Sequence, residues 1–176
     1  MKNKLSIFAL LISLNSLGQV VDKDLALEVH NSERISLKLQ PLKWSKKLET
    51  DARKYANYLA LKDIYRHSKD LTKLKQGENL YSTVYYVIDD NGEKYFFDET
   101  NYLFDASVAW LSEKKDYRYA KIGDRKNSLS MIGHYTQMIW SNSKEVGIAY
   151  SKSKSGNIYV VARYFPQGNW TGEYPY

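Results

Sequence analysis

The stretch GHYTQMIW, residues 133–140, contains one of the three histidines of the chain. It places His134 in a run of eight residues that carries no formal charge. A histidine in such a run can be a metal ligand, a general acid or base, or a buried hydrogen-bonding group. The run alone leaves these alternatives open, so the rest of the chain must decide between them.

The size and composition of the chain predict one globular domain. Its 176 residues, 43% hydrophobic and 26% charged, are enough to bury a core, and they show no sign of collagen, coiled coil or disorder. The chain has no Cys, which excludes disulfides, a thiol nucleophile and a thiolate metal site.

The N-terminus is typical of a signal peptide. Lys2 and Lys4 form a positive head, residues 5–14 are an apolar run too short to span a bilayer, and Ser16 and Gly18 are small. We therefore expect a signal peptide over residues 1–18 and a single domain over residues 19–176. The protein is then secreted, extracellular or periplasmic, and its mature chain has no transmembrane segment.

The charge of the mature chain argues against nucleic acid as a partner. Residues 1–18 contain two lysines and no acid, which leaves 24 basic and 20 acidic side chains, a net charge of +4. This mild excess forms no Arg/Lys stripe interleaved with aromatic residues, and no nucleic-acid motif is present.

Hydrophobic periodicity predicts an α+β fold, with helices flanking a small antiparallel sheet. Asn91-Gly92 is a strong turn signal between two aromatic, β-branched runs. Ser45 is a good N-cap for a helix whose apolar residues recur at helical spacing. The expected elements are helices over 22–39, from 46, over 98–119 and within 130–140, a hairpin over 80–97, and strands over 145–152 and 157–165.

Four polar residues are candidates for a functional site, and none is specific alone. Glu113 falls on an apolar helical stripe beside Trp110, where a carboxylate is costly unless it is paired or liganded. Glu78 follows Gly77, which indicates a backbone position that tolerates few side chains. Each has an ordinary alternative: Glu113 at the edge of its stripe, Glu78 in a turn, His67 as a helix C-cap and His134 as a satisfied core histidine.

Taken together, these segments resemble the CAP superfamily, also called the SCP domain. HNSER (30–34) resembles the HNxxR of its first helix, and PLKWSKKLETDARKYA (41–56) resembles its PLxW segment. His67-Ser68, the GEN box at 77–79, AWLSEKKDY (109–117), GHYTQMIW and YVVARYFPQGN (159–169) resemble the later motifs, in the family's order.

The resemblance implies an α-β-α sandwich with a cleft tetrad of His67, Glu78, Glu113 and His134. His67 and His134 would be the metal ligands, for Zn²⁺ or another divalent metal. Glu78 and Glu113 would orient these ligands or act as a general base. His30, in the first helix, would be structural.

Three functions stay open for such a cleft. The first is a non-catalytic binding module for a lipid or sterol, an envelope component or a protein partner. The second is a metal-dependent hydrolase of the cell envelope that cleaves a peptide or ester, with Glu78 or Glu113 as its base. The third is a structural tetrad with no physiological metal.

The chain departs from the family pattern in two ways. It has no disulfide, which resembles the bacterial or intracellular members. Residues 82–99 are longer than the usual spacing between the GEN box and the WxxE helix, and we expect the extra residues to form a hairpin at the rim of the cleft.

Overall fold

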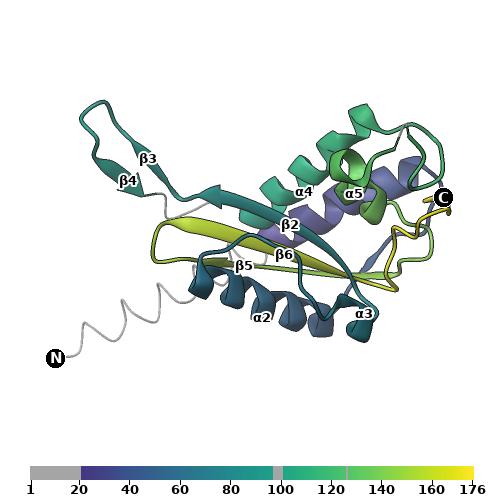
Figure 1. The fold of residues 1–176 in the computed structure, drawn as a ribbon, viewed down its shortest axis with the longest axis horizontal. Helices are drawn as coiled ribbons and strands as arrows, with labels where there is room; N and C mark the ends of the chain where they lie inside the picture. Colours follow the sequence, from purple (N-terminus) through teal and green to yellow (C-terminus); the bar gives the residue numbers. More distant parts are fainter. Residues whose placement is uncertain (1–20, 97–100, 126) are drawn as a thin grey trace.

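A four-stranded sheet forms the centre of the molecule (Figure 1). The computed structural model describes residues 21–96, 101–125 and 127–176, so the signal peptide expected over residues 1–18 lies outside the described residues. The strand order is β1 (Lys43–Trp44), β5 (Glu145–Lys152), β6 (Asn157–Phe165) and β2 (Gly77–Val84). β6 pairs antiparallel with both of its neighbours, and β1 pairs parallel with β5.

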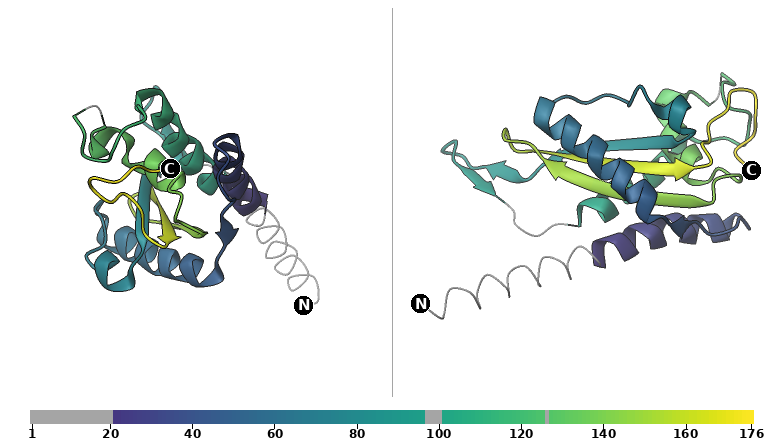
Figure 2. Two further views of the ribbon diagram at one scale, coloured as in Figure 1. Left: turned by 90° about the vertical axis from the view of Figure 1, so that its right-hand side faces the viewer. Right: turned by 90° about the horizontal axis from the view of Figure 1, so that it is seen from below.

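Both faces of this sheet are buried, because alternate side chains of a strand point to opposite faces. Ile158, Val160 and Ala162 of β6 belong to one hydrophobic cluster, whereas Tyr159 and Val161 belong to the other. One face is covered by α2 (Lys46–Lys62). The other is covered by the N-terminal helix (residues 21–36), α4 (Tyr102–Ser112) and α5 (Leu129–Met138) (Figures 1 and 2). The predicted α-β-α sandwich is confirmed.

Helix α2 lies directly on the backbone of β5. A Cβ atom built on Gly147 would lie 2.1 Å from the backbone nitrogen of Glu49. Glycine is therefore required at this crossing, and the helix packs its small residues, Ala52 and Ala56, against the sheet. Ser45 occupies the predicted N-cap position, although its side chain makes no capping hydrogen bond.

The N-terminal helix is tied to both helices of its layer. The carboxylate of Asp22 accepts hydrogen bonds from the backbone N–H groups of Leu103 and Phe104 and so caps the start of α4. The fully buried Arg34 donates to the carbonyl oxygens of Gln40, Met138, Trp140 and Ser143. The HNSER motif therefore fixes this helix to the C-terminal end of α5.

Two predicted helices have different bounds in the structure. The N-terminal helix ends at residue 36, and Lys38 has a φ of 59°, in the left-handed region. The helix predicted over 98–119 is α4, followed by a single 3₁₀ turn, η1 (Glu113–Asp116). Residues 97–100 lie outside the described residues.

The hairpin predicted over 80–97 divides into two sheets. Residues 77–84 form β2 and pair with β6 along their whole length, while only β3 (Tyr86–Ile88) and β4 (Lys94–Phe96) form the hairpin. Gly92, with a φ of 85°, occupies its turn as predicted. Figure 1 shows the hairpin projecting from the end of β2 opposite the short helix α3 (Leu71–Leu74). The expected position at the cleft rim is wrong, because the length of β2 separates the hairpin from the cleft.

In the described parts of the chain, no helix has the length and apolar character needed to cross a bilayer.

Candidate functional site

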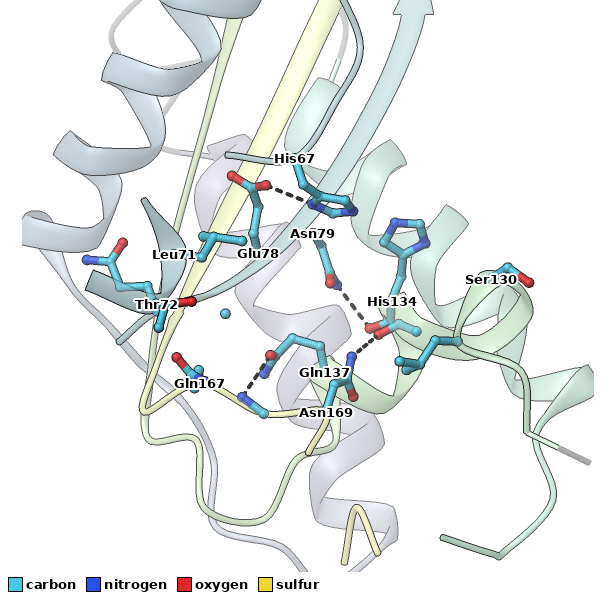
Figure 3. Close-up of a pocket in the computed structure, with 15 residues that line it drawn as sticks. His67, Leu71, Thr72, Glu78, Asn79, Ser130, His134, Gln137, Gln167 and Asn169 are labelled. Carbon is cyan, nitrogen blue, oxygen red and sulfur yellow. Dashed lines mark hydrogen bonds and ion pairs between the residues drawn. The ribbon is translucent and has the colours of Figure 1, made fainter. Parts of the chain in front are cut away.

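A pocket of about 420 Å³ opens where β2 begins (Figure 3). Its walls come from the loop after α2, from α3, from the first residues of β2, from α5 and from the segment after β6. The lining residues are His67, Leu71, Thr72, Gln76, Gly77, Glu78, Asn79, Leu129, Ser130, Gly133, His134, Gln137, Gln167, Gly168 and Asn169. Three of the four residues of the expected tetrad, His67, Glu78 and His134, therefore line one pocket.

The first histidine is held by the first carboxylate. His67 Nδ1 lies 2.8 Å from Glu78 Oε1, which also accepts a hydrogen bond from the backbone N–H of Ser68 at 3.0 Å. The side chain of His67 is 59% exposed, whereas that of Glu78 is fully buried. His67 is thus a ring on the surface fixed by a carboxylate inside the protein, and not a helix C-cap.

The second histidine is held in the same way from the other layer. His134 Nδ1 lies 2.6 Å from Glu113 Oε1, and Glu113 Oε2 accepts from the backbone N–H groups of His134 and Tyr135. Glu113 therefore ties η1 to α5, which explains a carboxylate directly after the apolar stripe of α4. The ring of His134 also stacks on that of Trp110, with the centroids 6.2 Å apart.

The two pairs approach the pocket from opposite faces of the sheet. Glu78 lies beside Arg163 on the face that α2 covers, and Glu113 belongs to the layer of α4 and α5. Because each imidazole gives its Nδ1 to a carboxylate, its Nε2 is left for a ligand. Figure 3 shows both rings at the same end of the pocket.

Arg163 lies behind Glu78. Its Nη2 is 2.9 Å from Glu78 Oε2, and both side chains are almost completely buried. This contact is an ion pair without hydrogen-bond geometry, and Nε and Nη1 of Arg163 have no hydrogen-bond partner among the described residues. Burial lowers the pKa of Arg163, and the charge of Glu78 opposes this shift. Glu78 is therefore the counter-ion of a buried cation as well as the support of His67.

A chain of hydrogen bonds connects the core to the pocket. His30 bonds the carbonyl oxygen of Ala26 through Nδ1 and the hydroxyl of Tyr164 through Nε2, and Asn79 Nδ2 donates to Tyr164 and to the carbonyl oxygen of His134. Burial lowers the pKa of His30 to about 4, so the ring is neutral at pH 7. His30 lies in this chain and outside the pocket, in agreement with the structural role implied by the resemblance.

The floor of the pocket is a rigid set of side-chain amides. Gln137 donates to Ser143 Oγ and accepts from the backbone N–H of Gly168, while Asn169 donates to the carbonyl oxygen of Gly133. A Cβ atom on Gly77 would lie 2.1 Å from Gln137 Oε1, so any larger residue there would require the side chain of Gln137 to shift. The sequence motifs contain Gln137 and Arg163, but they indicated no role for these two residues.

The donor set suits a loosely held divalent cation better than a closed structural site. Imidazole nitrogens whose rings are oriented by carboxylates are typical zinc ligands. However, within the described ranges no group of three or more His, Asp or Glu side chains is arranged to hold a metal ion. The two Nε2 atoms alone would need water or the bound ligand to complete a coordination shell.

The model of the family described as "CAP: Cysteine-rich secretory protein family" matches residues 27–164. The chain belongs to this family. Human Golgi-associated plant pathogenesis-related protein 1 is 33% identical over 147 residues, which cover 84% of either chain. Pathogenesis-related leaf protein 4 of Solanum lycopersicum is 33% identical over 153 residues, covering 85% of this chain and 80% of its own.

Solved CAP structures share the fold. The crystal structure of NaASP2 with Zn²⁺ superposes with a TM-score of 0.68 at 25% identity, covering 87% of this chain and 83% of its own. That of Na-ASP-1 has a TM-score of 0.71 at 26% identity, with 88% of this chain and 41% of its own covered. This CAP domain, which lacks cysteine, thus keeps the family architecture without disulfides.

Proposed function

We propose that this CAP protein is a secreted, non-catalytic binding module whose cleft receives a polar group of its ligand between His67 and His134. The observation that carries the proposal is the use of both Nδ1 atoms by buried or half-buried carboxylates. This arrangement orients two imidazoles and leaves two Nε2 atoms for one ligand. Preorganised groups of this kind bind well because little freedom is lost when the ligand arrives.

The lining favours an uncharged polar ligand group. Among the described residues that line the pocket, five carry side-chain amides, two carry hydroxyls and none is Lys or Arg. Glu78 is the one acidic residue in the part of the lining that the structure describes, and its charge is engaged by Arg163 and its Oε1 by His67. Amides and hydroxyls both donate and accept, which suits sugar hydroxyls or peptide groups of an envelope or protein ligand.

The apolar part of a lipid or sterol ligand fits a different hollow. A groove of about 470 Å³ lies between the N-terminal helix and α4, with Leu25, Val29, Phe104 and Leu111 among its walls. Within the described lining of the cleft, two side chains are apolar, those of Leu71 and Leu129. We therefore propose that the cleft binds the polar group of the ligand and that the groove holds its alkyl chain.

A divalent metal such as Zn²⁺ fits the cleft as part of this binding role. His67 and His134 would hold it through Nε2, and it would supply a positive charge for an oxygen of the ligand. Zn²⁺ is present in the crystal structure of the NaASP2 protein, which supports this assignment for the related fold.

The hydrolase alternative has less support from the geometry of the two carboxylates. Glu78 Oε1 accepts from His67 and Ser68, and Glu113 is occupied by three N–H donors. A general base needs a lone pair within reach of the proton that it removes. The contacts of Glu78 and Glu113 favour ring-orienting roles, and cleavage of a peptide or ester stays a hypothesis.

The first experiment is calorimetric titration of the metal-free mature protein with Zn²⁺. The matched variants are His67→Asn and His134→Asn, because the Asn Nδ2 can replace the imidazole Nδ1 on its carboxylate while Nε2 is removed. We expect one site in the wild type and at least a tenfold loss of affinity in each variant. Wild-type affinity in the double variant would contradict metal binding by these rings. If neither the wild type nor the variants bind Zn²⁺, the tetrad has a structural role and holds no metal.

The ligand class is tested separately by NMR of the imidazole rings of His67 and His134. We expect their ring signals to shift on addition of tri-N-acetylglucosamine, a neutral probe with amides and hydroxyls, and to shift less with inorganic phosphate. The double Asn variant provides the assignment control. A response to phosphate alone would contradict an uncharged polar ligand.

A further inference from the structure

The β3–β4 hairpin carries an apolar surface that the other described residues leave about half exposed. It projects away from the main sheet (Figure 1), and apolar side chains on both of its faces are about half exposed. These are Val87 (49%), Ile88 (58%), Tyr95 (52%) and Phe96 (55%). A two-stranded hairpin of three-residue strands is only marginally stable alone, so packing against a partner would stabilise it.

The outer edge of β3 is also open for hydrogen bonding. Among the described residues β3 pairs only with β4. The backbone N–H of Asp89 donates to Glu93 across the hairpin, and these directions alternate along a strand. The N–H and C=O groups of Tyr86 and Ile88 therefore point away from β4, toward the open edge.

We propose that a second copy of this chain occupies this edge, with the two β3 strands antiparallel and centred on Val87. In that register Tyr86 of one copy lies opposite Ile88 of the other. The outward-pointing groups of these two residues then form two hydrogen-bonded pairs related by a twofold axis. The two hairpins become one four-stranded sheet, which is large enough to be stable.

Charge complementarity selects a second copy as the occupant. The tip of the hairpin carries Asp89, Asp90 and Glu93. At its base Lys152 lies over the ring of Tyr85, with Nζ 4.7 Å from the ring centroid. Antiparallel pairing centred on Val87 brings Asp89 and Asp90 of one copy opposite residues 85 and 84 of the other. Each acidic tip thus meets the lysine at the base of its partner, twice in the dimer.

The same charges argue against a lipid surface as the occupant. An acidic tip is repelled by anionic headgroups, and an apolar hairpin that inserted into a membrane would have to desolvate its aspartates. The paired strands alone bury less surface than a standard protein interface, so the dimer is expected to be weak and to depend on concentration and salt.

Cysteine cross-linking tests this register directly, because the chain has no Cys of its own. Residues 87 of the two copies would face each other as a non-hydrogen-bonded pair, whose Cα separation of about 4.5 Å is compatible with a disulfide. The matched control is Val84→Cys, at a valine of similar exposure (44%). In the proposed register residue 84 of one copy lies opposite residue 90 of the other, so the two cysteines at position 84 are too far apart to form a disulfide.

We expect Val87→Cys to form a disulfide dimer with oxidised glutathione and Val84→Cys to stay monomeric. Asp90→Lys in the Val87→Cys background should slow cross-linking by about twofold to tenfold, and Lys152→Glu in that same chain should restore it, because both pairs are then reversed. Equal cross-linking of the two cysteine variants, or an Asp90→Lys effect that Lys152→Glu does not reverse, would overturn the proposal. So would a monomer of Val87→Cys at millimolar concentration.

Discussion

Glu78→Gln should destabilise the protein far more than the loss of an exposed ion pair. The Gln side chain can still accept hydrogen bonds from His67 and Ser68, so the change removes mainly the charge. It leaves Arg163 buried without its counter-ion, when two of its nitrogens already have no hydrogen-bond partner among the described residues. Removing one partner of a buried pair costs about 3–5 kcal/mol, or roughly 6–20 °C in Tm for a chain of this size.

The assay is urea unfolding followed by the fluorescence of the four tryptophans. Arg163→Met in the Glu78→Gln chain should recover much of the loss, because the orphan charge is then removed. The double-mutant cycle should give a coupling of about 2 kcal/mol or more. Glu113→Gln is the matched control, since Glu113 is bonded to N–H groups and pairs with no buried cation, and it should cost only about 1–2 kcal/mol. A cost below 1 kcal/mol for Glu78→Gln, or additive effects in the cycle, would refute the reasoning.

Three further predictions concern stability. In a chain with both cleft histidines changed to Asn, His30 should make the protein less stable as the pH falls from 6.5 toward 4, by up to about 3 kcal/mol. The reason is that the pKa of His30 is lower in the folded state, so the unfolded state binds the proton first. Urea unfolding across this pH range should show the loss of stability, and His30→Gln should remove it. Gly77→Ala should cost about 1–3 kcal/mol through its clash with Gln137, whereas Gly133→Ala, with its nearest neighbour at 3.6 Å, should be tolerated; equal urea midpoints would show that the floor of the pocket adapts. Asp22→Ala should cost about 1–2 kcal/mol by uncapping α4, and a loss below 0.5 kcal/mol in urea unfolding would show that water replaces the carboxylate.

The three-layer fold could be predicted from the sequence because its motifs are local and ordered. GHYTQMIW and YVVARYFPQGN fixed α5 and β6, and apolar periodicity identified α2. The division of residues 80–88 between two sheets could not be predicted, because period-two alternation is the same whether a strand pairs with β4 or with β6. The turn at Asn91-Gly92 was correct, but it specified only the nearest strand pair.

The roles of the site residues were harder to predict than which residues form the site. Resemblance grouped His67, Glu78, Glu113 and His134, and three of them line one pocket, while Glu113 holds His134 from behind it. Which ring nitrogen each carboxylate takes depends on the approach of two layers that are distant in sequence. The burial of Arg163 was missed because an arginine in a strand usually faces water, and only the register with Glu78 shows that this one does not.

The hydrogen-bond chain from Ala26 through His30, Tyr164 and Asn79 to His134 has a consequence for assembly. It passes from the N-terminal helix to β6, from β6 to β2, and from β2 to α5, so two helices and two strands contribute to it. A folding intermediate that lacks the last strand or the first helix would leave these groups unpaired and could not hold His134 in place. Ligand binding by this protein should therefore be an all-or-none property of the completed chain, and amide hydrogen exchange at the cleft should be as slow as exchange in the core.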